Sequence, residues 1–206
     1  MAIISNAVTI ADAGAFSVGL GAQVLIKTIT LSSAASTISF VDGASSVVLD
    51  DTYPIYQFEF INMHPATNLA EFTFNMSIDS GSNYNVTKTT TAFRARHHEN
   101  DSETSLEYRT PSDLAQSTSF QELMFNVGNG NDESGSGSLT LFNPSSTVFV
   151  KHFIATINNY DGSDITMNNY IAGYGNTTSA VDAIQFKMSS GNIDAGTIKM
   201  YGIKDS

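Results

Sequence analysis

Cysteine is absent from the 206 residues. The chain therefore has no disulfide, no thiolate nucleophile and no cysteine-based zinc or iron–sulfur site. Proline occurs four times, and no Pro-rich, Ser-rich or charged run marks a linker between domains. No stretch reaches the roughly 18 apolar residues of a membrane-spanning helix, and the first residues lack a basic signal region. We expect one domain, made as a soluble cytosolic protein, with no insertion into a membrane.

Basic residues are scarce as well. Nine Lys and Arg stand against 20 Asp and Glu, which gives a formal net charge of −11. Binding along a nucleic-acid backbone needs clustered Lys and Arg, so we expect no nucleic-acid partner. Charged residues make up 14% of the chain, and Ser, Thr, Asn and Gly supply most of the remaining polarity. Such a surface suits β-strands that pack against neighbours.

Sequence motifs of catalysis are also missing. The chain has no G-x-S-x-G nucleophile elbow, no S-x-x-K, no H-E-x-x-H and no phosphate-binding loop. A glycan-degrading enzyme would need two carboxylates about 5 to 10 Å apart in a cleft. Nearly all Asp and Glu residues fall in predicted loops, where no pair can be nominated. We therefore expect a protein that is not an enzyme and that uses no cofactor.

Apolar and polar residues alternate with a period of two in many short segments. In residues 55–61, for example, Phe58 and Phe60 share one face. About ten to twelve such strands predict an all-β fold, an antiparallel two-sheet β-sandwich of jelly-roll type. An immunoglobulin-like sandwich with extra strands is the alternative. Residues 1–22 predict an extended N-terminal arm or a first strand, and residues 23–206 a single sandwich domain.

Three segments carry more specific expectations. Residues 172–203 predict an antiparallel hairpin that closes the fold, because strands that end at Met188 and Tyr201 flank a loop rich in turn-forming residues. Residues 111–116 predict a short helical turn, the one place where the sequence favours a helix. Residues 128–137, GNGNDESGSG, contain no apolar side chain and predict a flexible loop.

Candidate ligand-binding residues fall in polar loops. Two loop tips offer side chains that suit a glycan, and their candidates are Asn131, Asp132, Glu133, Tyr160, Asp161 and Asp164. The first tip superficially resembles a calcium-binding loop. However, Ser134 stands where an EF-hand loop requires Gly, and Thr140 stands where the bidentate Glu belongs. We therefore expect no metal there.

Histidines and tyrosines are weaker candidates. The histidines are His64, His97, His98 and His152. Neighbours in a strand point to opposite sides, so His97 and His98 do not share a metal, and we expect His152 to face solvent or a neighbouring subunit. We predict no catalytic or metal-binding role for them. Tyr160, Tyr170 and Tyr174 offer rings on which sugars stack, although strand aromatics more often belong to a core or an interface.

Three stretches give the chain a family resemblance. They are SNYNVTKTTT at 82–91, LFNPSST at 141–147 followed by KHF at 151–153, and GNIDAGTIKMYGI at 191–203. Together they resemble largely uncharacterised β-sandwich proteins of tailed bacteriophages of marine bacteria. The last stretch also looks like the final hairpin of jelly-roll modules in phage fibres, decoration proteins and tail appendages.

The resemblance implies a non-enzymatic structural protein of the virion, either a capsid decoration protein or a component of a tail or fibre appendage. Such a protein is made in the host cytoplasm and has other virion proteins as partners. The resemblance also implies a homo-oligomer, with a trimer favoured, and we expect the N-terminal arm to dock on a neighbour. A carbohydrate-binding module that recognises a host surface glycan is the alternative.

Overall fold

The computed structural model describes the backbone of residues 3–5, 8–12 and 15–16, and residues 23–204 with their side chains. These residues form strands, turns and bends but no helix, and so none that could cross a membrane. The strands are β1 Ile3–Ser5, β2 Val8–Asp12, β3 Ala15–Phe16, β4 Gln23–Thr30, β5 Ile38–Val41, β6 Ile55–Pro65, β7 Ala70–Ser77, β8 Lys88–His98, β9 Thr104–Tyr108, β10 Gln121–Val127, β11 Gly135–Phe142, β12 Lys151–Asp161, β13 Ile165–Gly175, β14 Ala183–Met188 and β15 Ile193–Ile203.

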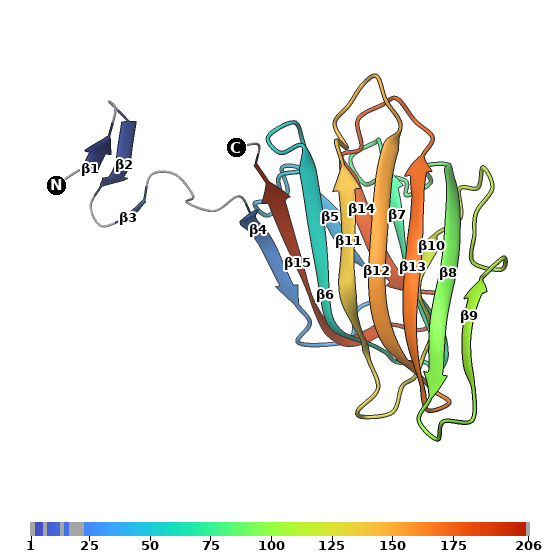
Figure 1. Ribbon diagram of the computed structural model, residues 1–206. Helices are drawn as coiled ribbons and strands as arrows, with labels where there is room; N and C mark the ends of the chain where they lie inside the picture. Colours follow the sequence, from blue (N-terminus) through green and yellow to red (C-terminus); the bar gives the residue numbers. More distant parts are fainter. Residues whose placement is uncertain (1–2, 6–7, 13–14, 17–22, 205–206) are drawn as a thin grey trace.

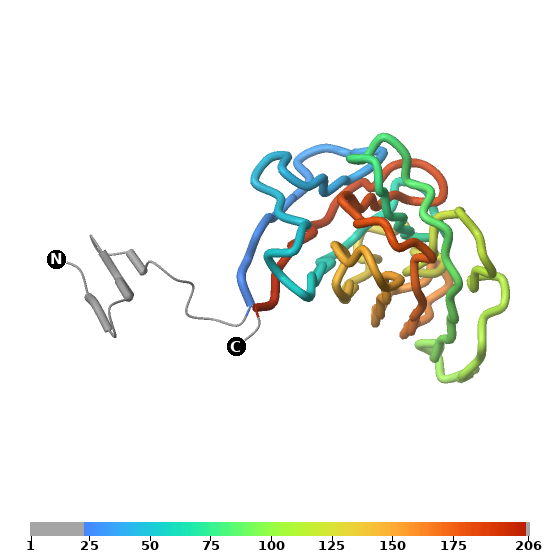
Figure 2. Tube along the Cα trace, turned by 90° about the horizontal axis from the view of Figure 1, so that it is seen from above, coloured from blue at the N-terminus to red at the C-terminus, as the bar shows by residue number. Residues whose placement is uncertain are grey.

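Twelve of these strands, β4 to β15, form one antiparallel, curled sheet. Its long run follows the order β4-β15-β6-β11-β12-β13-β8-β9, and a shorter run follows the order β10-β7-β14-β5 behind it (Figure 1). The pair Val127 and Asp161 links the two runs between β10 and β12. Seen along the strands, the sheet curls around its interior (Figure 2). The predicted all-β antiparallel fold and the number of strands are confirmed, whereas jelly-roll connectivity stays a prediction.

Phenylalanine rings from both runs fill the interior. Phe186 of β14 lies at the centre, with the rings of Phe60 and Phe72 at centroid distances of 5.2 and 5.7 Å. Phe58 and Phe60, predicted to share one face, are both fully buried. Each buried aromatic contributes about 2 to 3 kcal/mol in transfer terms. These strands therefore derive their stability from the face that the alternation assigned to the core.

The predicted closing hairpin is wrong. Strand β14 pairs with β7 and β5, whereas β15 pairs with β6 and β4, so consecutive strands lie in different runs of the sheet. Residues 189–192 cross between the runs, with Gly191 at a φ of 66°. A strand with one apolar face satisfies a hairpin and a crossover equally well, because both bury that face. The alternation alone therefore left the pairing partner undecided.

One local expectation fails. Residues 111–116 form a turn and bends, and Leu114 and the adjacent Ser117 form backbone hydrogen bonds with β8 instead of closing a helical turn.

A second local expectation holds in part. Residues 128–134 form the predicted loop, but strand β11 already begins at Gly135. A Cβ on Gly137 would lie 2.5 Å from the carbonyl oxygen of Thr156. Gly137 therefore allows close approach between strands.

Within residues 1–22, the described strands β1, β2 and β3 pair with one another in a small antiparallel sheet. The predicted docking of this segment on a neighbour rests largely on residues that lie outside the described part of the chain. The boundary between an arm and a domain at residues 22 and 23 stays a prediction.

Candidate functional site

The predicted ligand-binding loops meet at one end of the curled sheet, where β6 and β12 end and β11 and β13 begin. Backbone hydrogen bonds tie them together: Gly128 donates to the carbonyl of Tyr160 at 3.1 Å, and Gly162 to that of Asn126 at 3.4 Å. Nearby, Ala66 donates to Asn192 at 3.0 Å. Loops far apart in the sequence therefore share one surface, which we call the loop end.

A depression of about 570 Å³ opens at this loop end. Its lining residues are Asn62, His64, Asn131, Asp132, Glu133, Ser134, Asp194 and Ala195. Three of the sequence candidates thus lie together. The Glu133 carboxylate accepts the N–H of Gly130, whose carbonyl oxygen lies 3.1 Å from Nε2 of His64. Nδ1 of His64 lies 3.5 Å from Oδ2 of Asp194.

The other three candidates lie outside the lining of this depression. Asp161 is not a loop residue: it ends β12 and is buried. Tyr160 also belongs to β12, and its hydroxyl donates to Oδ1 of Asp164 at 3.0 Å. Burial, followed by hydrogen bonds to Asp164 and Glu99, raises the pKa of the Tyr160 phenol. These side chains support each other and do not extend the depression.

Two of the histidines each lie near a carboxylate that is close to them in the sequence. Nε2 of His97 lies 2.9 Å from Oδ1 of Asp101, and Nε2 of His98 lies 3.7 Å from Oε2 of Glu103. Across the residues that the structure describes, no three His, Asp or Glu side chains form a group that could hold a metal ion.

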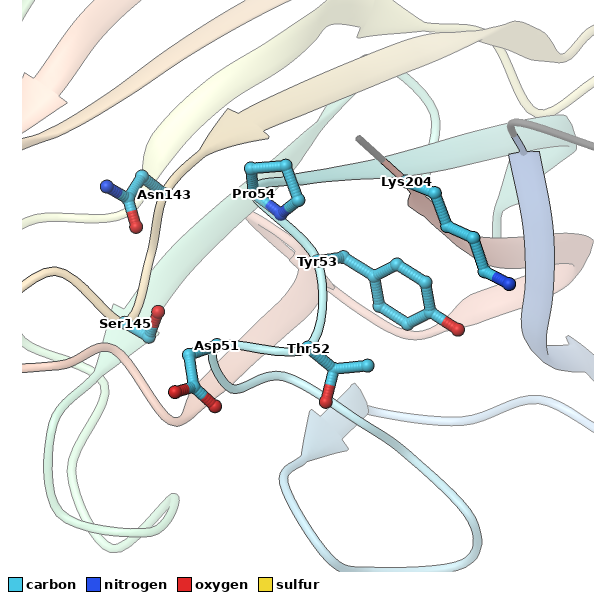
Figure 3. A pocket seen from close by; sticks show the side chains of 7 residues that line it. All are labelled: Asp51, Thr52, Tyr53, Pro54, Asn143, Ser145 and Lys204. Atoms are coloured by element: carbon cyan, nitrogen blue, oxygen red, sulfur yellow. The ribbon is translucent and has the colours of Figure 1, made fainter. Parts of the chain in front are cut away.

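A second depression, of about 400 Å³, lies at the opposite end of the curled sheet. Tyr53 and Lys204 stand on one side of it, and Asp51, Asn143 and Ser145 on the other (Figure 3). The ring of Tyr53 packs directly against Gly202, which fixes its position. The one amino group and the one carboxylate thus sit apart.

The most unusual surface lies on the outer side of β12, β13, β8 and β9. On β8, β12 and β13 its outward side chains alternate mostly with buried ones, and on β9 with the half-buried Ser105 and Glu107. They are Thr89, Thr91, Phe93, Ala95, His97, Thr104, Leu106, Tyr108, His152, Ile154, Thr156, Asn158, Tyr160, Thr166, Asn168, Tyr170, Ala172 and Tyr174. None of them is Asp, Glu, Lys or Arg. We call this surface the uncharged face.

Large apolar side chains stand exposed on the uncharged face. Leu106 is 74% exposed and Ile154 is 52% exposed. The rings of Phe93 and Tyr170 stack at a centroid distance of 4.8 Å and an interplanar angle of 9°, and Tyr108 lies opposite Phe93 in the next strand. An exposed apolar surface that spans several strands marks an interaction site more often than solvated surface.

A groove runs across the uncharged face, and we call it the outer groove. It has a volume of about 450 Å³ and is lined by Thr89, Thr90, Thr91, Phe142, His152, Phe153, Ile154, Ala172, Gly173 and Tyr174. A smaller hollow of about 140 Å³ shares Thr91, Ile154 and Ala172 with it and leads to the Phe93 and Tyr170 stack. Gly173 has room for no side chain, because a Cβ there would lie 2.5 Å from the carbonyl oxygen of Thr89.

Sequence reasoning foresaw this surface only in part. His152 faces outward on β12, as predicted, and Tyr170 and Tyr174 are surface aromatics as the binding and interface interpretations require. Phe93, Leu106 and Ile154 were not singled out. The signal that could have found them is the absence of charge from the outward positions of four strands in a chain that carries 20 Asp and Glu.

Comparison of the chain with models of known protein families, with curated proteins and with solved structures finds no match.

Proposed function

We propose that this chain is a non-enzymatic structural protein of a bacteriophage particle, a capsid decoration protein or a component of a tail or fibre appendage. It binds neighbouring virion subunits through the uncharged face. The observation that carries the proposal is the exposure of Leu106, Ile154, Phe93 and Tyr108 on a surface without Asp, Glu, Lys or Arg. Monomeric soluble proteins seldom leave a contiguous apolar surface of this kind uncovered.

The composition of this face favours a protein over a sugar as its partner. Leu106, Ile154 and Ala172 are aliphatic, whereas sugar rings stack on aromatic side chains and bond to polar ones. The net charge of −11 supports the same conclusion. A contact free of charge lets an acidic subunit pack against another acidic subunit without desolvating like charges. The family resemblance adds the virion as the setting and favours a trimer of copies.

The direct test is incorporation into particles of the phage that encodes the chain. Leu106→Glu places a charge in the uncharged face, and Leu25→Glu is the matched control, because Leu25 is also exposed but lies on β4, away from this face. We expect mass spectrometry of purified particles to find the wild-type and Leu25→Glu chains, and at least about tenfold less of the Leu106→Glu chain, since a buried unpaired charge costs several kcal/mol. Normal incorporation of Leu106→Glu, or absence of the wild-type chain from particles, contradicts the proposal.

A second candidate function, recognition of a host surface glycan, is favoured by the depression at the loop end. Its amide and carboxylate side chains include Asn131, Asp132 and Glu133, which suit the hydroxyl groups of a sugar. A ligand that binds the native state raises the melting temperature. We expect a bound glycan to raise it for the wild-type chain and not for Asp132→Ala. A panel of cell-surface glycans, each tested with and without EDTA, that leaves the melting temperature unchanged removes this function.

A further inference from the structure

One loop of the molecule presents two large apolar side chains to solvent. Between β11 and β12 the chain leaves the sheet at residues 143–150, and there Val148 is 67% exposed and Phe149 is 69% exposed. Both belong to the apolar residues that normally lie in the interior. An adjacent Val and Phe, exposed together at a loop tip, form an apolar knob.

Hydrogen bonds fix the conformation of this loop. The ammonium group of Lys151, whose side chain is buried, donates to the carbonyl oxygens of Ser146 at 2.6 Å, Phe149 at 2.7 Å and Thr177 at 3.2 Å. The Ser146 hydroxyl accepts the N–H groups of Val148 at 3.2 Å and Phe149 at 3.0 Å. A loop fixed in this way loses little conformational entropy on binding, so its exposed side chains are suited to anchor a contact.

The outer groove is the matching receptor on the same molecule. Its lining includes the apolar residues Phe142, Ile154 and Ala172, and it contains no Asp, Glu, Lys or Arg. Its volume of about 450 Å³ accommodates an aromatic side chain with its neighbour. Neither Val148 nor Phe149 of the same chain lines it. Within the part of the chain that the structure describes, each copy therefore carries both an exposed knob and an open groove.

We propose that Val148 and Phe149 of one copy insert into the outer groove of a second copy, and that this contact assembles the protein with itself. The inference rests on the proposed function and deepens it by naming the partner of the uncharged face. Both partners in the contact lack charge, so two chains of net charge −11 meet where they do not repel. Copies joined by a knob and a groove assemble either reciprocally about a twofold axis or head to tail, and a head-to-tail contact closes into a ring when the rotation permits.

The knob alone is smaller than a stable interface, which buries roughly 1,200–2,000 Å² in total. The rest of the contact comes from the uncharged face around the groove, where Phe93, Tyr108 and Leu106 extend the apolar surface. The knob is then the anchor at the centre of the contact, and its neighbours exclude water from it.

The first test is the solution mass, measured by size-exclusion chromatography with light scattering at physiological salt. We expect the wild-type chain to show a multiple of 22.0 kDa and Phe149→Ser to show 22.0 kDa. Leu25→Ser is the matched control, because it removes another exposed apolar side chain outside the contact, and it keeps the wild-type mass. A wild-type monomer at micromolar concentration, or an unchanged mass for Phe149→Ser, overturns the inference.

The second test is complementation between two variants. Ala172→Trp places an indole ring in the groove and leaves the knob intact. Phe149→Ser removes the knob and leaves the groove intact. Each alone is expected to be monomeric with a melting temperature close to that of the wild type. Mixed together, they are expected to form a one-to-one complex of twice 22.0 kDa, because one knob meets one groove. A mixture that stays monomeric overturns the inference.

The two experiments distinguish failure of the knob-and-groove contact from failure of the proposed virion role. If Phe149→Ser keeps the wild-type mass while Leu106→Glu is lost from phage particles, the uncharged face is an interface but the knob is not its anchor. If Phe149→Ser becomes monomeric while the wild-type chain is absent from purified phage particles, copies assemble through the knob and the virion role falls.

Discussion

The outer surface of the long run of strands divides into two halves that share a fold and differ in chemistry. On β6 and β15, Glu59 lies opposite Lys199 in the register, and the hydroxyls of Thr30 and Thr197 lie 2.9 Å apart. On β12, β13, β8 and β9 the outward positions hold no Asp, Glu, Lys or Arg. Both halves cover the same phenylalanine core, so the core does not dictate this difference. The first half presents charged and hydroxyl groups to solvent, and the second is the surface that we propose meets a partner.

The uncharged face does not arise from a shortage of lysine in its strands. Lys88 of β8 and Lys151 of β12 point inward and are fully buried, and neither contacts a carboxylate: Lys88 donates to Oδ1 of Asn75 at 2.5 Å and to the carbonyl of Val86 at 2.8 Å. Burying an ammonium group is costly. Both lysines are therefore buried at a cost in free energy, whereas the outward positions of the same strands hold no Asp, Glu, Lys or Arg.

Because both halves cover the same core, we expect the inner face to determine folding. The largest effect on stability is therefore expected there. Phe186→Ala removes the ring that contacts Phe60 and Phe72 at the centre of the core. We expect a loss of about 3–5 kcal/mol in the free energy of unfolding, because transfer and cavity terms add. Urea denaturation measures it. Leu106→Ala, on the uncharged face, is the control. Both variants are made in the Phe149→Ser background, which is expected to be monomeric, and there Leu106→Ala is expected to change stability by less than about 0.5 kcal/mol. Equal losses for the two variants would mean that the outer face also stabilises the monomer.

The next effect concerns the buried lysine of β8. Burial lowers the pKa of Lys88 from its ordinary 10.5 to about 7. Between these values the unfolded chain binds the proton and the folded chain does not, so stability rises with pH and is lost as pH falls toward about 7. We expect a slope of up to about 1.4 kcal/mol per pH unit in the range from about pH 7.5 to 9.5.

Urea denaturation at several pH values measures this slope. Lys88→Met is expected to flatten it, and Lys199→Met, which removes an outward lysine on β15, is expected to leave it unchanged. An equally flat curve for the wild-type chain would show that Lys88 is protonated in the fold.

The strands were predictable from the sequence, but their partners were not. Alternation placed Phe58 and Phe60 inside because a buried face must be apolar whatever the neighbouring strand is. The same alternation suggested that β14 pairs with β15, although each pairs elsewhere. Pairing is decided by long-range packing, such as the contact of Phe186 with Phe60, which adjacent residues do not report.

The candidate site was predictable to a similar extent. A run of polar residues marked Asn131, Asp132 and Glu133 as a loop tip, and all three line the depression at the loop end. Asp194, which completes the lining, comes from the opposite end of the chain and had no local signal. Asp161 was misplaced because a polar residue at the end of a strand looks like a loop residue in the sequence, yet the fold buries it.

A smaller effect is expected from the aromatic stack of the uncharged face. Phe93→Leu removes the ring that stacks on Tyr170 at 4.8 Å and keeps an apolar side chain. In the Phe149→Ser background, which is expected to be monomeric, we expect thermal unfolding to show a loss of about 0.5–1.5 kcal/mol, the worth of an aromatic pair beyond its burial. Phe93→Tyr is the control and retains the stack. A loss as large as that of Phe186→Ala would place Phe93 in the core.

The smallest effect is expected on the charged half of the outer surface, which carries Glu59 and Lys199. A double-mutant cycle with Glu59→Gln and Lys199→Gln measures the coupling of two side chains that lie opposite each other in neighbouring strands. We expect about 0.2–1 kcal/mol, falling as salt screens the pair. The solution mass is expected to stay that of the wild type, because solvated charges take no part in assembly. If instead either variant becomes monomeric, the charged half is also an interface, and the absence of charge no longer separates the surface that meets a partner from the surface that meets water.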